Sequence, residues 1–96
     1  MPTKYYTVML NTGAPPPVAA LKVVFGEAKS WAKFHANAWV IATDLTADDW
    51  YQRIRAVLPP DDHVLVLRAD RGDYKGWVAS VMADWMQQDH SAKEGL

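Results

Sequence analysis

Three aspartates, Asp44, Asp48 and Asp49, stand close together and could hold a divalent cation, because such ions prefer oxygen ligands. The spacing of Thr46 and Asp49 gives a second interpretation. A threonine followed three residues later by an acidic residue is typical of the capping box at a helix N-terminus. Carboxylates at that end also interact favourably with the helix dipole. We therefore predict that these aspartates cap a helix rather than bind a metal.

A second acidic group, Asp61 and Asp62, directly precedes His63 and could form a metal or acid–base site. Successive residues of an extended chain point to opposite sides, so these three side chains are not expected to converge. They follow a Pro-Pro pair at 59–60, and aspartates are frequent in turns because they bond to nearby backbone groups. We predict a solvated turn that leads into a strand.

Basic and aromatic residues alternate in one segment, as they do where proteins bind nucleic acids or other partners. Lys29, Trp31 and Lys33 fall close together, and Trp39 follows in the next apolar run. Exposed tryptophans are enriched at protein interfaces, and bases can stack on them. These four residues are candidate binding residues, with packing in a small core as the alternative for the two tryptophans. The net charge of −1 gives no general attraction to nucleic acid.

The chain has 96 residues, half of them hydrophobic, and no cysteine, which excludes disulfides and thiolate metal sites. We predict one domain over 1–88 and a polar, fraying tail over 89–96. His90 in this tail, like His35, is expected at the surface because neither has a partner at ligand spacing. The apolar runs are much shorter than the ~20 residues of a membrane span. No targeting segment is apparent, and we expect a cytoplasmic protein without a membrane partner.

Apolar periodicity predicts the elements that position these residues: strands over 5–10, 30–35, 38–43 and 63–67, and helices over 17–25, 46–58 and 75–86. The strand over 63–67 is apolar throughout, as expected for a central strand buried on both faces. Trp77, Val81 and Trp85 are four residues apart and are predicted to form the buried face of the last helix. The order β-α-β-β-α-β-α predicts an α+β, ferredoxin-like fold. Its four-stranded antiparallel sheet carries two helices on one face and a further C-terminal helix.

Several short motifs occur together in this order. A tryptophan-bearing strand ends in Thr-Asp-Leu-Thr at 43–46, a short helix follows, and an Asp-Asp pair precedes an apolar strand. Gly76-Trp77 and Trp85 come later in the chain. With these motifs the chain resembles the small SinR-like proteins, relatives of the second CRISPR-associated protein. The resemblance implies a ferredoxin-like homodimer with a sheet-based interface and, in some members, metal-dependent cleavage of RNA or DNA.

The cleavage-competent members of that family carry an aspartate at the end of the first strand, where one from each subunit holds a divalent metal. The matching residue here is Asn11, whose amide supplies neither an anionic oxygen nor a base. We therefore expect a non-catalytic homodimer that binds a protein or nucleic-acid partner without a cofactor, with a defence or mobile-element system as one setting. We expect dimerisation through a sheet edge or the C-terminal region, since an open sheet edge promotes aggregation unless it is covered. The alternative is a toxin-like, Mg²⁺- or Mn²⁺-dependent endonuclease of the same fold.

Overall fold

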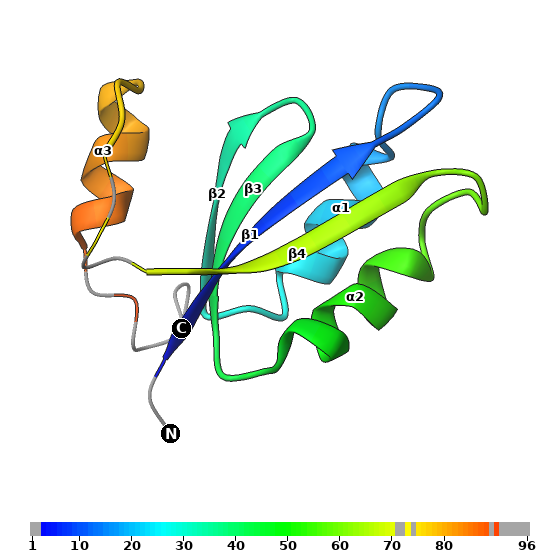
Figure 1. Cartoon of the computed structure of the whole chain (residues 1–96), viewed down its shortest axis with the longest axis horizontal. Coiled ribbons are helices and arrows are strands. Elements are labelled where there is room, and N and C mark those ends of the chain that lie inside the picture. Colours follow the sequence, from blue (N-terminus) through cyan, green and yellow to red (C-terminus); the bar gives the residue numbers. More distant parts are fainter. Residues whose placement is uncertain (1–2, 71–72, 74, 89, 91–96) are drawn as a thin grey trace.

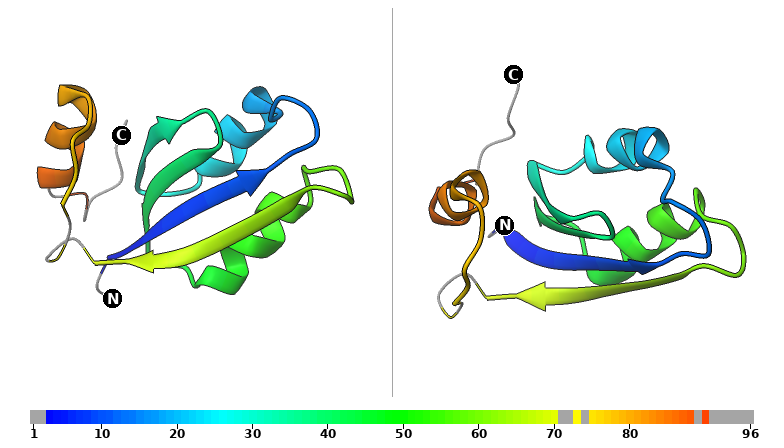
Figure 2. Two further views of the ribbon diagram at one scale, coloured as in Figure 1. Left: turned by 45° about the horizontal axis from the view of Figure 1, so that its top comes forward. Right: turned by 90° about the horizontal axis from the view of Figure 1, so that it is seen from above.

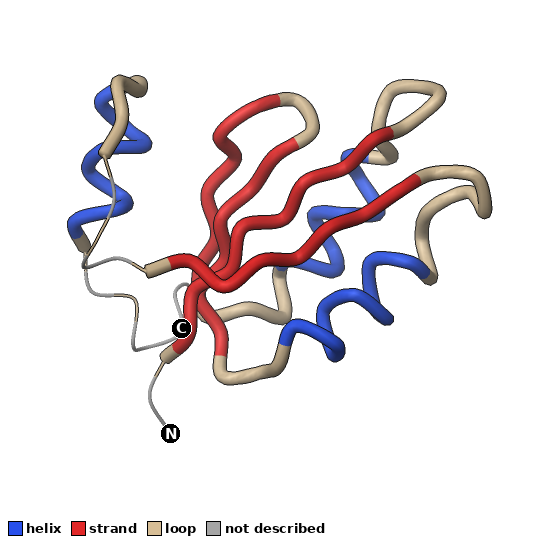
Figure 3. Tube along the Cα trace, in the orientation of Figure 1, coloured by secondary structure: helices blue, strands red, loops and turns tan. Residues whose placement is uncertain are grey.

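The computed structural model describes residues 3–70, 73, 75–88 and 90. These residues form four strands and three helices in the predicted order (Figure 1; Figure 3 shows the same path by element type). The elements are β1 (Lys4–Asn11), α1 (Val18–Phe25), β2 (Ser30–His35), β3 (Ala38–Thr43), α2 (Ala47–Arg55), β4 (His63–Ala69) and α3 (Ser80–Gln87).

The strands form one antiparallel sheet in the order β2-β3-β1-β4. Because side chains alternate along a strand, Tyr6 and Val8 of β1 point to one face of the sheet and Tyr5 and Met9 to the other. The register between β2 and β3 is irregular at Lys33–His35, whereas β4 pairs with β1 without interruption. The sheet therefore presents two faces with different coverings.

Helices α1 and α2 cover the first face, which we call the helix face (Figure 2). Trp50 is fully buried there, and its indole N–H donates a 3.0 Å hydrogen bond to Thr43 Oγ1. Arg53 of α2 forms an ion pair with Glu27, just after α1, and so links the two helices. The other fully buried apolar side chains of this core are Val8, Leu21, Phe25, Ile41 and Ile54.

Helix α3 packs on the opposite face, which we call the open face (Figure 2). Its buried residues, Met82 and Trp85, form a second and smaller core with Tyr5, Val40 and Ala42. The indole N–H of Trp85 donates a 2.8 Å hydrogen bond to Ser30 Oγ and fixes the helix to β2. This contact lies over the β2 side of the sheet, and on the open face of β4 Leu65 and Leu67 stay exposed while Ala69 packs against the small core.

The last helix begins later than the sequence predicts. Residues 75–79 are not helical, and Ala79 has an extended backbone with φ −57° and ψ 148°. The prediction that Trp77 and Val81 form a buried face is wrong, because Trp77 precedes the helix and both side chains are exposed. The helix instead buries Met82 and Trp85, which lie three residues apart on one side of it.

The prediction that β4 is a central strand is also wrong. It occupies the edge of the sheet next to β1, and Leu65 and Leu67 on its open face are 51% and 46% exposed. Val64 and Val66 on the helix face are half-buried. A continuous apolar run indicates that both faces suit burial, but it carries no information about the order of strands in the sheet.

His90 is buried, contrary to the surface position predicted for it, whereas His35 is exposed as expected. The Nε2 atom of His90 donates a 2.8 Å hydrogen bond to the backbone oxygen of Trp85, and the two rings stack with centroids 4.2 Å apart. The rest of the predicted tail, 89 and 91–96, lies outside the described residues. Among the described helices, each is too short or too polar to span a bilayer.

Candidate partner-binding groove

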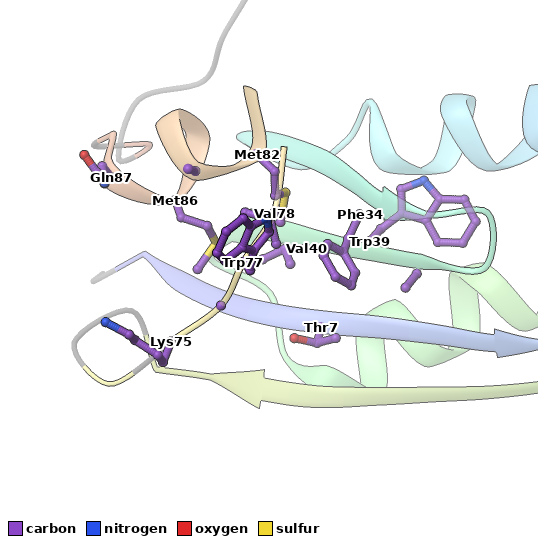
Figure 4. Close-up of a pocket in the computed structure, with 13 residues that line it drawn as sticks. Thr7, Phe34, Trp39, Val40, Lys75, Trp77, Val78, Met82, Met86 and Gln87 are labelled. Atoms are coloured by element: carbon purple, nitrogen blue, oxygen red, sulfur yellow. The ribbon is translucent and has the colours of Figure 1, made fainter. Parts of the chain in front are cut away.

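A groove lies between the open face of the sheet and the α3 side of the molecule (Figure 4). Its volume is about 590 Å³. Ligand pockets in proteins are typically about 300–1,000 Å³, so the groove can receive several apolar side chains. The sheet contributes Thr7, Phe34, Ala38 and Val40, and the opposite wall contributes Trp77, Val78, Met82 and Met86.

The two walls of the groove are positioned in different ways. Trp85 anchors α3 through its hydrogen bond to Ser30 and through an edge-on ring contact with Tyr5, at 6.2 Å between centroids. This anchoring places Met82 and Met86 above the sheet. On the sheet side, Phe34 falls in the register irregularity of β2 and is 56% exposed.

The most unusual groove residue is Trp77, which is fully exposed on the segment that precedes α3. Its indole is one of the side chains that line the groove (Figure 4). Aromatic residues and methionine are enriched in protein interfaces, and the flexible methionine side chain adapts to different partners. The lining therefore suits apolar side chains.

Two of the predicted binding residues, Lys29 and Trp31, have partners within the fold. Lys29 Nζ lies 3.0 Å from Asp44 Oδ1 and donates a 3.0 Å hydrogen bond to Thr3 Oγ1. The ring of Trp31 packs on Phe25 with centroids 6.0 Å apart, on the helix face. Neither residue borders the groove.

The other two predicted binding residues, Lys33 and Trp39, lie next to each other. Trp39 is among the residues that line the groove, but it is only 2% exposed because its ring packs on Phe25 with centroids 5.3 Å apart (Figure 4). Lys33 Nζ lies 5.8 Å from the centre of the Trp39 ring. The four candidates thus do not form one exposed basic and aromatic surface, and a binding role for them stays a prediction.

Within the first acidic group, Asp49 caps α2 as predicted and Asp48 lies in the first turn of the helix, whereas Asp44 pairs with Lys29 instead. The backbone N–H of Thr46 donates to Asp49 Oδ2 at 3.0 Å, and the backbone N–H of Asp49 donates to Thr46 Oγ1 at 3.1 Å. The hydrogen bond from the Thr46 backbone, followed by that from its hydroxyl, lowers the pKa of Asp49 below its ordinary value. The Asp49 carboxylate therefore accepts hydrogen bonds at the N-terminus of α2.

The second acidic group belongs to a turn, also as predicted. Asp62 Oδ1 accepts a 3.2 Å hydrogen bond from the backbone N–H of Gly13, and its own N–H donates to the Pro59 oxygen at 3.1 Å. Asn11 is exposed at the end of β1 and pairs with His63 in the register with β4. Within the described ranges, no three His, Cys, Asp or Glu side chains form a group that could hold a metal ion.

The sequence analysis did not predict the groove, because the four-residue spacing of Trp77, Val81 and Trp85 placed Trp77 on the buried face of a helix. A signal was present in Gly76, since glycine directly before Trp77 disfavours a helix that starts at 75. The position of Phe34 in the groove depends on the irregular register of β2, which no residue type in the sequence indicates.

Comparison with family models, curated proteins and solved structures finds no match to the chain.

Proposed function

We propose that this protein is a non-catalytic binding module that holds an apolar segment of a partner protein in the groove between α3 and the open face. The observation that carries the proposal is the full exposure of Trp77 at a groove whose other wall presents the half-exposed Phe34. Tryptophan is the residue type most often found at the energetic centre of a protein interface.

The size of Trp77 makes it a suitable anchor. A buried tryptophan removes about 150–250 Å² from water, which at about 25 cal/mol per Å² gives a gross gain of about 4–6 kcal/mol. Because the side chain is fully exposed in the isolated chain, a partner gains this whole amount before the costs of association.

A protein segment suits the groove better than a nucleic acid. Among the described residues that line the groove, Lys75 is the single charged one, and Lys29 is paired with Asp44 elsewhere. Nucleic-acid binding draws its affinity from several cations placed along the phosphate backbone. The nuclease alternative gains no support from Asp49 or Asp62, whose oxygens accept backbone hydrogen bonds in a cap and a turn.

We further infer a ferredoxin-like topology, which the strand order supports. β3 lies between β1 and β2, and β1 lies between β3 and β4, as two interleaved split βαβ units require. In such a fold α1 and α2 occupy one face and leave the other free. Here α3 and the segment before it pack over part of that free face, and the groove lies between them and the sheet. The SinR-like relationship stays a prediction that rests on the short motifs of the sequence.

A peptide-display selection tests the proposal and itself supplies a ligand for the groove. Random peptides are selected on the full-length protein and then tested against Trp77→Ala and Val81→Ala. Trp77 precedes α3 and Val81 lies on it; both are exposed, but only Trp77 borders the groove. We expect enriched peptides with large apolar residues that bind the wild type and Val81→Ala but lose binding to Trp77→Ala.

Two results would contradict the proposal: no enriched peptide, or peptides that bind Trp77→Ala as well as the wild type. A parallel titration with labelled RNA and DNA at two salt concentrations tests the nucleic-acid alternative. Binding that weakens with salt and is lost in Lys29→Ala or Lys33→Ala would assign the function to those residues instead.

A further inference from the structure

An apolar strip on the open face continues the groove toward β4. It consists of Met9 of β1 and of Leu65 and Leu67 of β4, all three of which are exposed. We call these three residues the apolar shelf. In the register of the sheet Leu67 lies opposite Thr7, which lines the groove. The shelf and the groove therefore form one continuous apolar surface, and such surfaces mark sites where proteins interact.

The strands turn their charged side chains away from this surface. The Lys and Arg residues of the four strands are Lys4, Lys33 and Arg68, and the alternation of side chains directs each to the helix face. Lys33 Nζ lies 5.8 Å from the centre of the Trp39 ring, and the Arg68 guanidinium lies 5.9 Å from that of Tyr6, both rings of the helix-face core. A partner that covers the open face therefore needs an apolar surface.

A segment that is buried on this surface must satisfy its own backbone hydrogen bonds. The strands bond to one another in the plane of the sheet, so the open face presents side chains rather than backbone groups. An extended segment laid on these apolar side chains would bury its N–H and C=O groups without partners, which is costly. An α-helix forms these bonds within itself, and α1 and α2 cover the other face of the same sheet in this way.

We propose that the partner segment is an amphipathic α-helix that lies beside α3, with its apolar side on the groove and the apolar shelf. The inference rests on the proposed function and specifies the structure of the segment that the groove binds. Met82 and Met86 of α3 then contact its flank, at the distance of about 8–10 Å between axes that is usual for packed helices. Lys75 is the one charged side chain among the described residues that line the groove, so it favours acidic residues on the polar side of the partner helix.

The width of the sheet sets the length of the partner helix. From Phe34 on β2 to Leu67 on β4 the surface crosses the whole sheet in the order β2-β3-β1-β4, a distance of about 14 Å at about 4.8 Å between strands. A helix rises about 1.5 Å per residue, so about ten residues, or about three turns, cover this distance. Apolar residues spaced i, i+4 and i+7 lie along one side of such a helix. We therefore expect a stripe of this spacing to reach from the groove to the apolar shelf.

Two peptide libraries of equal length and composition, selected on the full-length protein, test this inference. One library places its large apolar residues at i, i+4 and i+7, and the other alternates them at i, i+2 and i+4, with alanine, glutamine and glutamate elsewhere in both. We expect the peptides that bind the wild type and lose binding to Trp77→Ala to come from the first library. Far-ultraviolet circular dichroism of these peptides should show helix forming on binding.

A substitution on the apolar shelf tests the second part of the contact. Leu67→Gln introduces no charge and is expected to weaken binding of the selected helical peptide about fivefold or more. The matched control is Val23→Gln on α1, an exposed apolar residue in the helix layer on the other side of the sheet. It should bind the peptide within about twofold of wild type. Thermal unfolding confirms that both variants fold.

The outcomes separate this inference from the proposed function. If binding that depends on Trp77 comes only from the alternating library, the groove still binds a protein segment but the helix is overturned. If no library yields binding that depends on Trp77, the proposed function fails as well. Equal affinity of the helical peptide for the wild type and Leu67→Gln overturns the inference. So does a dimer, detected by sedimentation equilibrium, that covers the apolar shelf and excludes the peptide.

Discussion

Helix α3 forms one wall of the groove, and its attachment to the sheet depends mainly on one side chain. Trp85 is buried, stacks on His90, contacts the edge of Tyr5 and donates a hydrogen bond to Ser30. The substitution Trp85→Ala removes all of these contacts. We expect α3 to detach while the sheet, α1 and α2 remain folded.

The magnitude follows from how few α3 residues are buried. Truncating a buried tryptophan to alanine costs about 3–5 kcal/mol. Full burial of Met82, the other α3 residue in this core, gains about 1.5–3 kcal/mol. The loss of Trp85 therefore removes more of the stabilisation of α3 than Met82 supplies, and we expect the helix to detach from the sheet.

Hydrogen exchange measured by mass spectrometry resolves this prediction by region. In Trp85→Ala, amides of residues 80–88 are expected to lose protection, whereas those of β1 and β3 keep theirs. The matched control is Trp77→Ala, which removes the same side chain from a fully exposed position and is expected to change stability by less than about 0.5 kcal/mol. Retained protection in α3 would refute this account of its attachment, and so would loss of protection throughout the sheet.

Two further predictions concern the core and the cap of α2. Thr43→Val leaves the buried indole N–H of Trp50 without its acceptor, so we expect urea titrations to show a free energy of unfolding about 1–3 kcal/mol lower. The control, Thr7→Val on the open face, should change the free energy of unfolding little. Equal effects of the two substitutions would contradict the role of this hydrogen bond. Because the pKa of Asp49 is lowered in the folded state, its contribution to stability is full above the ordinary carboxyl pKa of 3.8 and is lost as the pH falls through the lower folded-state value. Asp49→Asn should therefore be less stable than wild type at neutral pH, and this difference in stability should shrink in strong acid. A difference that does not change with pH would contradict the claim that the charged carboxylate of Asp49 stabilises the cap.

Local patterns predicted the elements and several of their ends. Strands β2 and β3 match the predicted ranges, and the Thr46–Asp49 spacing correctly predicted the capping box. These features depend on residues close in sequence, so propensity and spacing suffice to identify them. Trp50 and Ile54, four residues apart, are both buried on the side of α2 that faces the sheet, as helical periodicity leads one to expect.

Apart from the late start of α3, which Gly76 signals locally, the errors depend on contacts between residues distant in sequence. The burial of His90 requires Tyr5, about eighty-five residues earlier, whose hydroxyl accepts its backbone N–H. The edge position of β4 depends on β1 pairing between β3 and β4. The groove combines the β2 irregularity at Phe34 with the late start of α3, which moves Trp77 off the helix. Periodicity within a segment contains none of this information.

The most direct test of the proposed function is the affinity of a selected peptide for three forms of the protein, measured by isothermal titration calorimetry. If Trp77 is the anchor of the groove, Trp77→Ala should weaken binding by about thirtyfold or more, as expected for a residue worth at least 2 kcal/mol at an interface. Val81→Ala should bind within about twofold of wild type, because this exposed residue does not line the groove. Equal affinities for the wild type and Trp77→Ala would contradict the proposal that the groove binds the partner.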